Sequence, residues 1–111
     1  MKGKDSFQLA WLETGGVYRI PKWYHDETFT VYADSTLKWN RTYPNLPADS
    51  VVLCLDSIPV KLDTNHYIDT TFGCCPFLTM EGKQVWLFVG CFEHYYRGHL
   101  AMPGNQFERI D

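Results

Sequence analysis

Residues 77–89 read FLTMEGKQVWLFV, in which two apolar runs flank a short polar connection that contains Gly82. Runs of this length, rich in aromatic and β-branched residues, are typical of strands. A glycine in the connection supplies the positive φ that a tight turn between antiparallel strands requires. The stretch therefore predicts a β-hairpin, and this hairpin decides the fold class.

Other segments on both sides of the hairpin also have strand character. Some alternate polar and apolar residues, and one is an almost continuous apolar run of strand length. Several short strands at close spacing predict a small barrel or sandwich. The segments with this pattern are residues 17–20, 28–32, 50–55 and 106–110.

Helical signals are limited to short pieces of the chain. Residues 6–13 and 92–97 each fit one helical turn, and glycine and proline predict a loop at residues 98–104. We therefore expect a mostly β fold with at most one or two short helical turns. A length of 111 residues predicts one domain, residues 1–111.

The charge of the chain bears on its partners and its compartment. Its 10 basic and 13 acidic side chains give a net charge of −3, and the basic residues are scattered. Nonspecific nucleic-acid binding needs a basic face, so nucleic acid is not the expected partner. The sequence has no long apolar stretch, which predicts neither a signal peptide nor a membrane span. We expect a cytoplasmic protein with reduced cysteines.

The order of these segments resembles an SH3-like small β-barrel. The start Gly16-Val17-Tyr18-Arg19 and a hairpin with Gly-Lys-x-x-Trp are similar to short SH3-like proteins encoded by phages, over about residues 15–110. The resemblance implies a barrel with a long first loop, in an accessory factor acting in the host cytoplasm. It does not imply recognition of Pro-rich peptides, because Trp86 stands alone and the Ala-Leu-Tyr-Asp-Tyr motif is missing. The segments that resemble the first strand, first loop, second strand, distal turn and closing strand are residues 16–20, 21–49, 50–56, 81–83 and 107–110.

Aromatic residues make up 16% of the chain, which is more ring surface than so small an interior can hide. Only roughly two-thirds of the unfolded surface is removed from water at this size. Exposed tryptophan and tyrosine are favoured in binding surfaces, so we predict a non-enzymatic protein-binding module. The alternative is that the rings form a second small core beneath a long loop. The predicted partner-binding residues are Trp23, Tyr24, Tyr32, Trp39 and Tyr43.

A Cys/His pattern near the C-terminal end offers a second candidate site. Cys91, His94 and His99 are spaced as Cys-x2-His-x4-His, and Cys75 or its neighbour Cys74 could supply a fourth ligand. Zinc prefers such thiolate and imidazole ligands. A second closely spaced ligand pair is missing, however, and a buried reduced cysteine packs as a small hydrophobe. We therefore predict no metal and no cofactor, and retain these residues as candidates.

Two further function classes stay open at this point. A cysteine beside a histidine can act as nucleophile and base, so a small ligand-binding domain or thiol-based enzyme is one alternative. No family signature surrounds the cysteines, and we expect no enzymatic activity. The other alternative is stacking of single-stranded bases on the rings, which the acidic balance opposes. The oligomeric state stays open.

Overall fold

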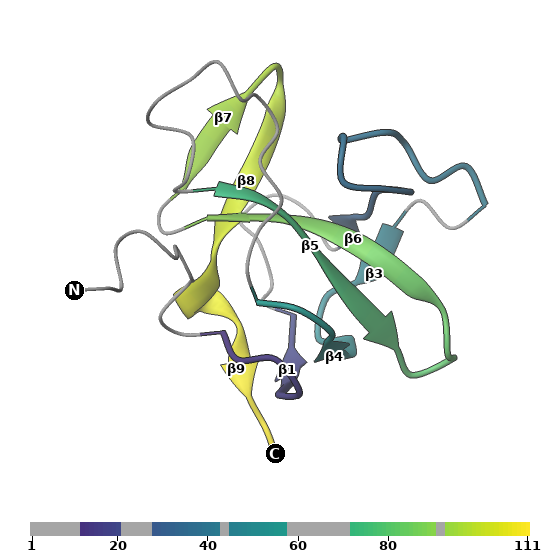
Figure 1. Cartoon of the computed structure of the whole chain (residues 1–111), viewed down its shortest axis with the longest axis vertical. Helices are drawn as coiled ribbons and strands as arrows, with labels where there is room; N and C mark the ends of the chain where they lie inside the picture. The colour runs from purple at the N-terminus through teal and green to yellow at the C-terminus, as the bar shows by residue number, and fades with distance from the viewer. Residues whose placement is uncertain (1–11, 21–27, 43–44, 58–71, 91–92) are drawn as a thin grey trace.

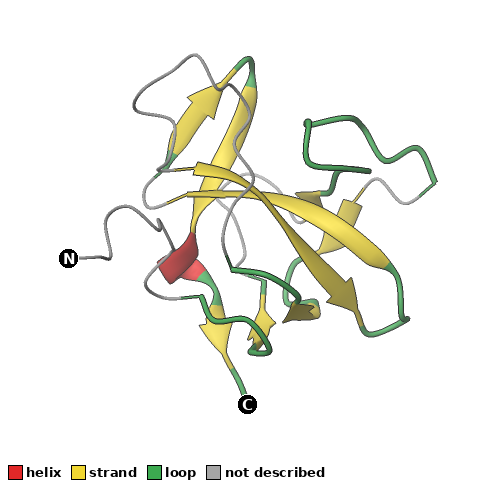
Figure 2. Ribbon diagram, viewed as in Figure 1, coloured by secondary structure: helices red, strands yellow, loops and turns green. Residues whose placement is uncertain are grey.

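The computed structural model describes residues 12–20, 28–42, 45–57, 72–90 and 93–111. These residues form nine strands and one short 3-10 turn, with no α-helix among them (Figures 1 and 2). The described part of the chain contains no helix with the length and apolar character needed to cross a membrane. The elements are β1 (Val17–Arg19), β2 (Thr28–Thr30), β3 (Asn45–Pro47), β4 (Val51–Cys54), β5 (Phe72–Thr79), β6 (Gln84–Gly90), β7 (His94–Tyr96), β8 (His99–Pro103), the 3-10 turn Gly104–Gln106 and β9 (Glu108–Arg109).

Seven strands form one sheet in the order β7-β8-β6-β5-β4-β1-β9, and β2 pairs with β3 in a separate ribbon. All neighbours in the large sheet are antiparallel except β6 and β8, which run parallel. The prediction of a mostly β fold is confirmed. The described strands form an open sheet and not a closed barrel, because the edge strands β7 and β9 each pair with one described neighbour.

The hairpin predicted from residues 77–89 is confirmed as β5 and β6, the longest pair of strands (Figure 1). Gly82 has a φ of 83°, as the connection requires, and its N–H donates to the Thr79 carbonyl at 2.9 Å. The Thr79 N–H donates to the Lys83 carbonyl at 2.8 Å and closes the loop. Strand β5 starts earlier than predicted, at Phe72.

Two sequence-based assignments after β6 are wrong. The described part of the predicted helical turn at residues 92–97 is strand β7, and most of the predicted loop at residues 98–104 is strand β8. Arg97 and Gly98 have φ values of 52° and 83° and form the two-residue connection between these strands. Positive φ at both positions is the pattern of a type I′ hairpin turn. The difference arises because Gly98 forms part of a tight turn between two strands and does not begin a long loop.

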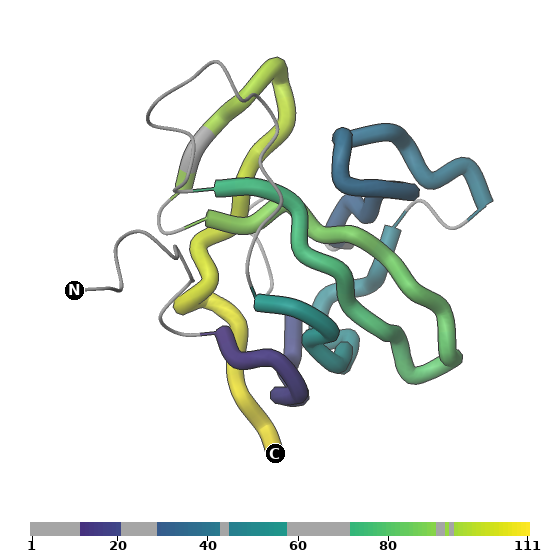
Figure 3. The backbone as a smooth tube through the Cα atoms, viewed as in Figure 1, coloured from purple at the N-terminus to yellow at the C-terminus, as the bar shows by residue number. Residues whose placement is uncertain are grey.

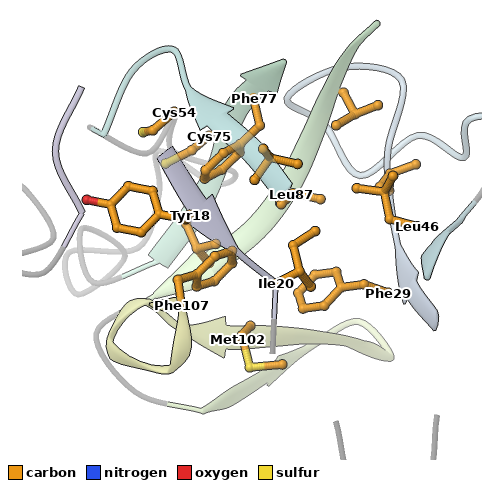
Figure 4. Close-up of a cluster of buried hydrophobic side chains, with 14 of the residues drawn as sticks. Tyr18, Ile20, Phe29, Leu46, Cys54, Cys75, Phe77, Leu87, Met102 and Phe107 are labelled. Carbon is orange, nitrogen blue, oxygen red and sulfur yellow. The ribbon is translucent and has the colours of Figure 1, made fainter. Parts of the chain in front are cut away.

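The two faces of β5 and β6 pack into two different hydrophobic cores, because successive strand residues point to opposite faces. The first core gathers side chains from the strands of the large sheet and from β2 and β3 (Figure 4). The second core is smaller and includes the described loop after β2. Members of the first core are Leu12, Tyr18, Ile20, Phe29, Val31, Leu46, Val52, Cys54, Cys75, Phe77, Val85, Leu87, Val89, Met102 and Phe107; members of the second are Tyr32, Leu37, Phe72, Cys74, Phe88 and Ala101, with Trp86 and Tyr96 packed against them.

Tyr18 anchors the first core to the segment that precedes β1. Its ring is fully buried, and its hydroxyl oxygen, at the edge of the cluster in Figure 4, accepts a hydrogen bond of 2.8 Å from the Glu13 N–H. A Cβ atom at Gly16 would lie 2.9 Å from the Tyr18 ring and 3.1 Å from the Glu13 carbonyl oxygen. Glycine at position 16 therefore allows the tyrosine to fold back over the turn.

Candidate functional site

The structure describes two of the five predicted partner-binding residues, and it places them differently. Trp23, Tyr24 and Tyr43 lie outside the described residues. Tyr32 is buried in the second core, with 4% of its surface exposed, whereas Trp39 is 58% exposed. The expectation that Tyr32 faces solvent is therefore wrong, because its ring packs in a core beneath the loop, whereas partner binding through the exposed Trp39 stays a prediction.

Residues 32–39 form a small hairpin, called here the Trp39 hairpin, that brings these two rings together. Tyr32 and Trp39 pair as an isolated bridge, and the Ala33 N–H donates to the Lys38 carbonyl at 2.7 Å. At the tip, the Asp34 carboxylate accepts hydrogen bonds from the backbone N–H and the hydroxyl of Thr36. These local bonds give the hairpin a defined shape.

Two contacts fix the Trp39 hairpin to the sheet. Tyr32 and Trp86 of β6 exchange backbone hydrogen bonds of 2.8 and 3.1 Å. Leu37 enters the second core with a φ of 64°, a left-handed conformation that leucine seldom adopts. The burial of an apolar side chain, ~1.5–3 kcal/mol, is large enough to hold this strained residue in place. Trp39 therefore belongs to a hairpin that is held to the sheet by backbone hydrogen bonds at Tyr32 and by the burial of Leu37.

Three rings from two different hairpins meet at the surface and form what we call the Trp39 cluster: Tyr32, Trp39 and His99. Their centroids lie 5.9 Å apart for Tyr32 and Trp39, 5.5 Å for Trp39 and His99, and 5.4 Å for Tyr32 and His99. The Tyr32 hydroxyl oxygen lies 3.0 Å from Nδ1 of His99 and forms a hydrogen bond with it. The cluster thus links the Trp39 hairpin to the β7–β8 hairpin; Figure 3 traces both segments in the upper part of the view.

The polar groups beneath the cluster are uncharged at neutral pH. Burial, together with the nearby Cys74 thiol, raises the pKa of Tyr32 to about 12. Burial also raises the pKa of Cys74 to about 12, although the Leu37 backbone N–H near the sulfur acts in the opposite direction. A protonated, fully buried thiol is a poor nucleophile. The buried Cys74 thiol therefore packs in the core beneath the exposed Trp39, and it is not activated as a nucleophile.

The rings continue from His99 along the β7–β8 hairpin. Tyr96 lies opposite His99 in the strand pairing, packs on Phe72 at 5.6 Å between centroids, and carries the Arg97 guanidinium 5.1 Å above its ring. The Tyr96 hydroxyl is buried and has no hydrogen-bond partner among the described residues. Tyr95 is 67% exposed, and strand alternation points it to the other face of the hairpin, away from this row of rings.

The candidate metal ligands do not assemble into one site among the described residues. Cys75 belongs to the first core, whereas His99 contacts Tyr32 on the opposite face of the sheet, so these two cannot share a metal ion. Burial, with lesser contributions from nearby thiols and an acid, raises the pKa of Cys75 well above its usual range. Cys91 and the His94 side chain lie outside the described residues. Within the described residues, no three His, Cys, Asp or Glu side chains come together to hold an ion.

The two adjacent cysteines, Cys74 and Cys75, do not belong to one site. Cys74 and Cys75 are successive residues of β5 and therefore point into different cores. Cys54 shares the first core with Cys75, and burial raises its pKa to about 11. All three described cysteines are free and buried, which is the environment of packing residues.

Three further residues contribute to this site without having been predicted: the buried Leu37 anchors the Trp39 hairpin, and Tyr96 and Arg97 extend the row of rings. Gly98 could have indicated the turn of the second hairpin, because glycine readily adopts the positive φ that such a turn requires. Leu37 had no such signal, since its left-handed backbone depends on the core it enters. Comparison of the chain with protein-family models, curated proteins and solved structures gives no match.

Proposed function

We propose that this protein is a non-enzymatic protein-binding module and that its binding surface is centred on Trp39. The observation that carries the proposal is an indole with 58% of its surface exposed, positioned by ring contacts to Tyr32 and His99. Tryptophan buries a large area when a partner covers it and is enriched among the residues that dominate binding energy.

The way in which Trp39 is held also favours binding. An exposed ring on a mobile loop must be ordered when it binds, and that ordering reduces affinity. Here the hairpin is hydrogen-bonded to Trp86, anchored by Leu37, and supported by two rings. A partner would therefore meet a surface that is already close to its bound form.

The proposal includes the resemblance to short SH3-like proteins of phages. In its favour, the segments that resemble the successive SH3-like strands are neighbours in the sheet, in the order β9-β1-β4-β5-β6. The β7–β8 hairpin is an addition that the resemblance does not include. We propose an accessory factor that acts in the host cytoplasm, with the Trp39 hairpin and the β7–β8 hairpin as decorations of a shared sheet.

The alternative of a thiol-based enzyme has less support. The three described cysteines are buried, and burial raises the pKa of each thiol, which disfavours the reactive thiolate at neutral pH. The proposed binding function needs no ionised thiol.

The test compares Trp39→Ala with a matched control, Tyr95→Ala, which removes another well-exposed ring, on the opposite face of the β7–β8 hairpin. Each immobilised variant is incubated with native host lysate, and the captured proteins are quantified by mass spectrometry. We expect Trp39→Ala to lose the specific partner while Tyr95→Ala retains it, with both variants unfolding cooperatively. Full capture by Trp39→Ala would contradict the proposal.

A further inference from the structure

We propose that the partner presents an acidic peptide segment, with an apolar side chain on Trp39 and a carboxylate on Arg97. This inference rests on the proposed protein-binding function and adds the chemistry of the partner. It depends on three observations: the backbone conformation of Arg97, the position of its guanidinium, and the continuity of the surface from Arg97 to Trp39.

The backbone conformation of Arg97 is unfavourable for an arginine. Arg97 has a φ of 52° in the two-residue turn between β7 and β8, followed by Gly98 at 83°. Turns of this kind favour asparagine, aspartate or glycine at the first central position. Left-handed residues of other types are uncommon and concentrate where a side chain serves binding or catalysis. An arginine that strains its own turn is therefore a candidate for recognition.

The guanidinium of Arg97 is exposed but held in one place. It lies 5.1 Å above the Tyr96 ring, and Tyr96 is in turn packed on Phe72. Among the described residues, no carboxylate lies within ion-pair distance of Arg97, whereas Arg19 and Arg109 both have acidic partners. A planar guanidinium offers paired donors that match the two oxygens of a carboxylate. Arg97 thus presents a pre-positioned cation that is available to an acidic group.

The surface is continuous from this cation to the exposed indole. Arg97 covers Tyr96, Tyr96 pairs across the strands with His99, and His99 lies 5.5 Å from Trp39. An extended segment that crosses this row would meet an apolar platform at one end and a cation at the other.

The charges beside Trp39 favour the same kind of partner, although the whole chain has a net charge of −3. Lys38 and Arg41 are exposed and flank Trp39 in the chain. The Asp34 carboxylate on the same hairpin keeps its charge, accepts two hydrogen bonds from Thr36 and interacts with Lys38, so it offsets one of these two cations and leaves the other. The local surplus of cations therefore suits carboxylates better than basic groups.

The test selects peptides from a displayed library of random short sequences on the immobilised protein. The variants are Arg97→Asn, which removes the charge, and Arg97→Asp, which reverses it; both new residues suit the turn. Trp39→Ala removes the apolar ring of the proposed site, and Tyr95→Ala is the matched control. Circular dichroism and thermal melting of every variant show whether it is folded.

We expect the wild type and Tyr95→Ala to select peptides in which Asp or Glu accompanies an aromatic or aliphatic residue. Arg97→Asn should lose the acidic preference, and Arg97→Asp should select Lys or Arg in its place. Trp39→Ala should recover no peptide above background. A synthetic consensus peptide should bind Arg97→Asp about tenfold more weakly than wild type in fluorescence anisotropy.

The outcomes separate this inference from the proposed function. The inference would be overturned if the peptides selected by the wild type showed no acidic preference, or if Arg97→Asp selected the same acidic peptides. Either result would still be compatible with a binding module that depends on Trp39. Recovery of no peptide by the wild type would count against both. Labelled oligothymidine tests the other macromolecular class. Salt-sensitive binding of that probe, lost in Arg97→Asp, would overturn the acidic-peptide assignment in favour of nucleic acid.

Discussion

The hydrogen bond between Tyr32 and His99 is predicted to couple the Trp39 hairpin to the β7–β8 hairpin energetically. Tyr32→Phe removes the hydroxyl that lies 3.0 Å from Nδ1 of His99 and keeps the ring that packs in the second core. A hydrogen bond of this kind contributes about 0.5–1.5 kcal/mol to stability. Because the volume of the ring is preserved, we expect no additional cost from a cavity.

The coupling is measured with a double-mutant cycle. The second variant, His99→Phe, keeps a ring beside Trp39 but leaves the buried Tyr32 hydroxyl without its partner, so it should cost more than Tyr32→Phe, about 1–3 kcal/mol. The double variant removes both polar groups. Urea denaturation of the four proteins should give a coupling free energy of about 1 kcal/mol.

The control for this cycle is Val52→Ala combined with Tyr32→Phe, since Val52 lies in the first core and Tyr32 in the second. Its coupling to the hydroxyl should be near zero. A Tyr32–His99 coupling below about 0.3 kcal/mol, which is within the usual error of additivity, would refute the view that this bond joins the two hairpins.

Three other predictions concern the cores and the ionisable groups. Gly16→Ala should lower the free energy of unfolding by about 1–3 kcal/mol, because the new Cβ would meet the Tyr18 ring at 2.9 Å; urea denaturation checks this, and an unchanged midpoint would contradict it. Tyr96→Phe should stabilise the protein by about 1 kcal/mol, because it removes a buried hydroxyl that has no partner in the described part of the chain; a lower melting temperature would contradict this. The free energy of unfolding should fall as pH rises above about 9, because folding raises the pKa of Cys54 from 9.0 to about 11, that of Cys74 from 9.0 to about 12 and that of Tyr32 from 10.0 to about 12. Folding favours the neutral form of each group, so each group contributes fully to stability below its unfolded pKa, and this contribution is lost as the pH rises to its folded pKa. Urea denaturation measures the effect, and constant stability between pH 8 and about 10.5 would contradict the prediction.

The strands with strong local signals could be predicted from the sequence. The β5–β6 hairpin follows from two apolar runs and Gly82, and β1 follows from an apolar segment between Gly16 and Pro21. These signals are local because turn residues and strand residues act within a few positions of each other. They did not reveal the pairing partners of each strand, which depend on contacts far apart in the chain.

The second core and the Trp39 cluster could not be predicted in the same way. Most of β5 and β6 is apolar on both faces, so the pattern indicates burial without identifying what covers each face. The surplus of aromatic residues predicted that some ring would stay exposed, but not that Trp39 would do so while Tyr32 is buried. That distinction comes from the hairpin at residues 32–39 and from contacts with His99, which lies far along the chain.

The most direct test of the Trp39 surface is hydroxyl-radical footprinting, read by mass spectrometry, of the free protein and of its complex with the selected peptide. In the free protein, Trp39 and Tyr95 should be modified rapidly and the buried Tyr18 and Tyr32 slowly. Addition of the peptide should protect Trp39 and leave Tyr95 reactive. Slow modification of Trp39 in the free protein, or equal modification with and without peptide, would contradict the account.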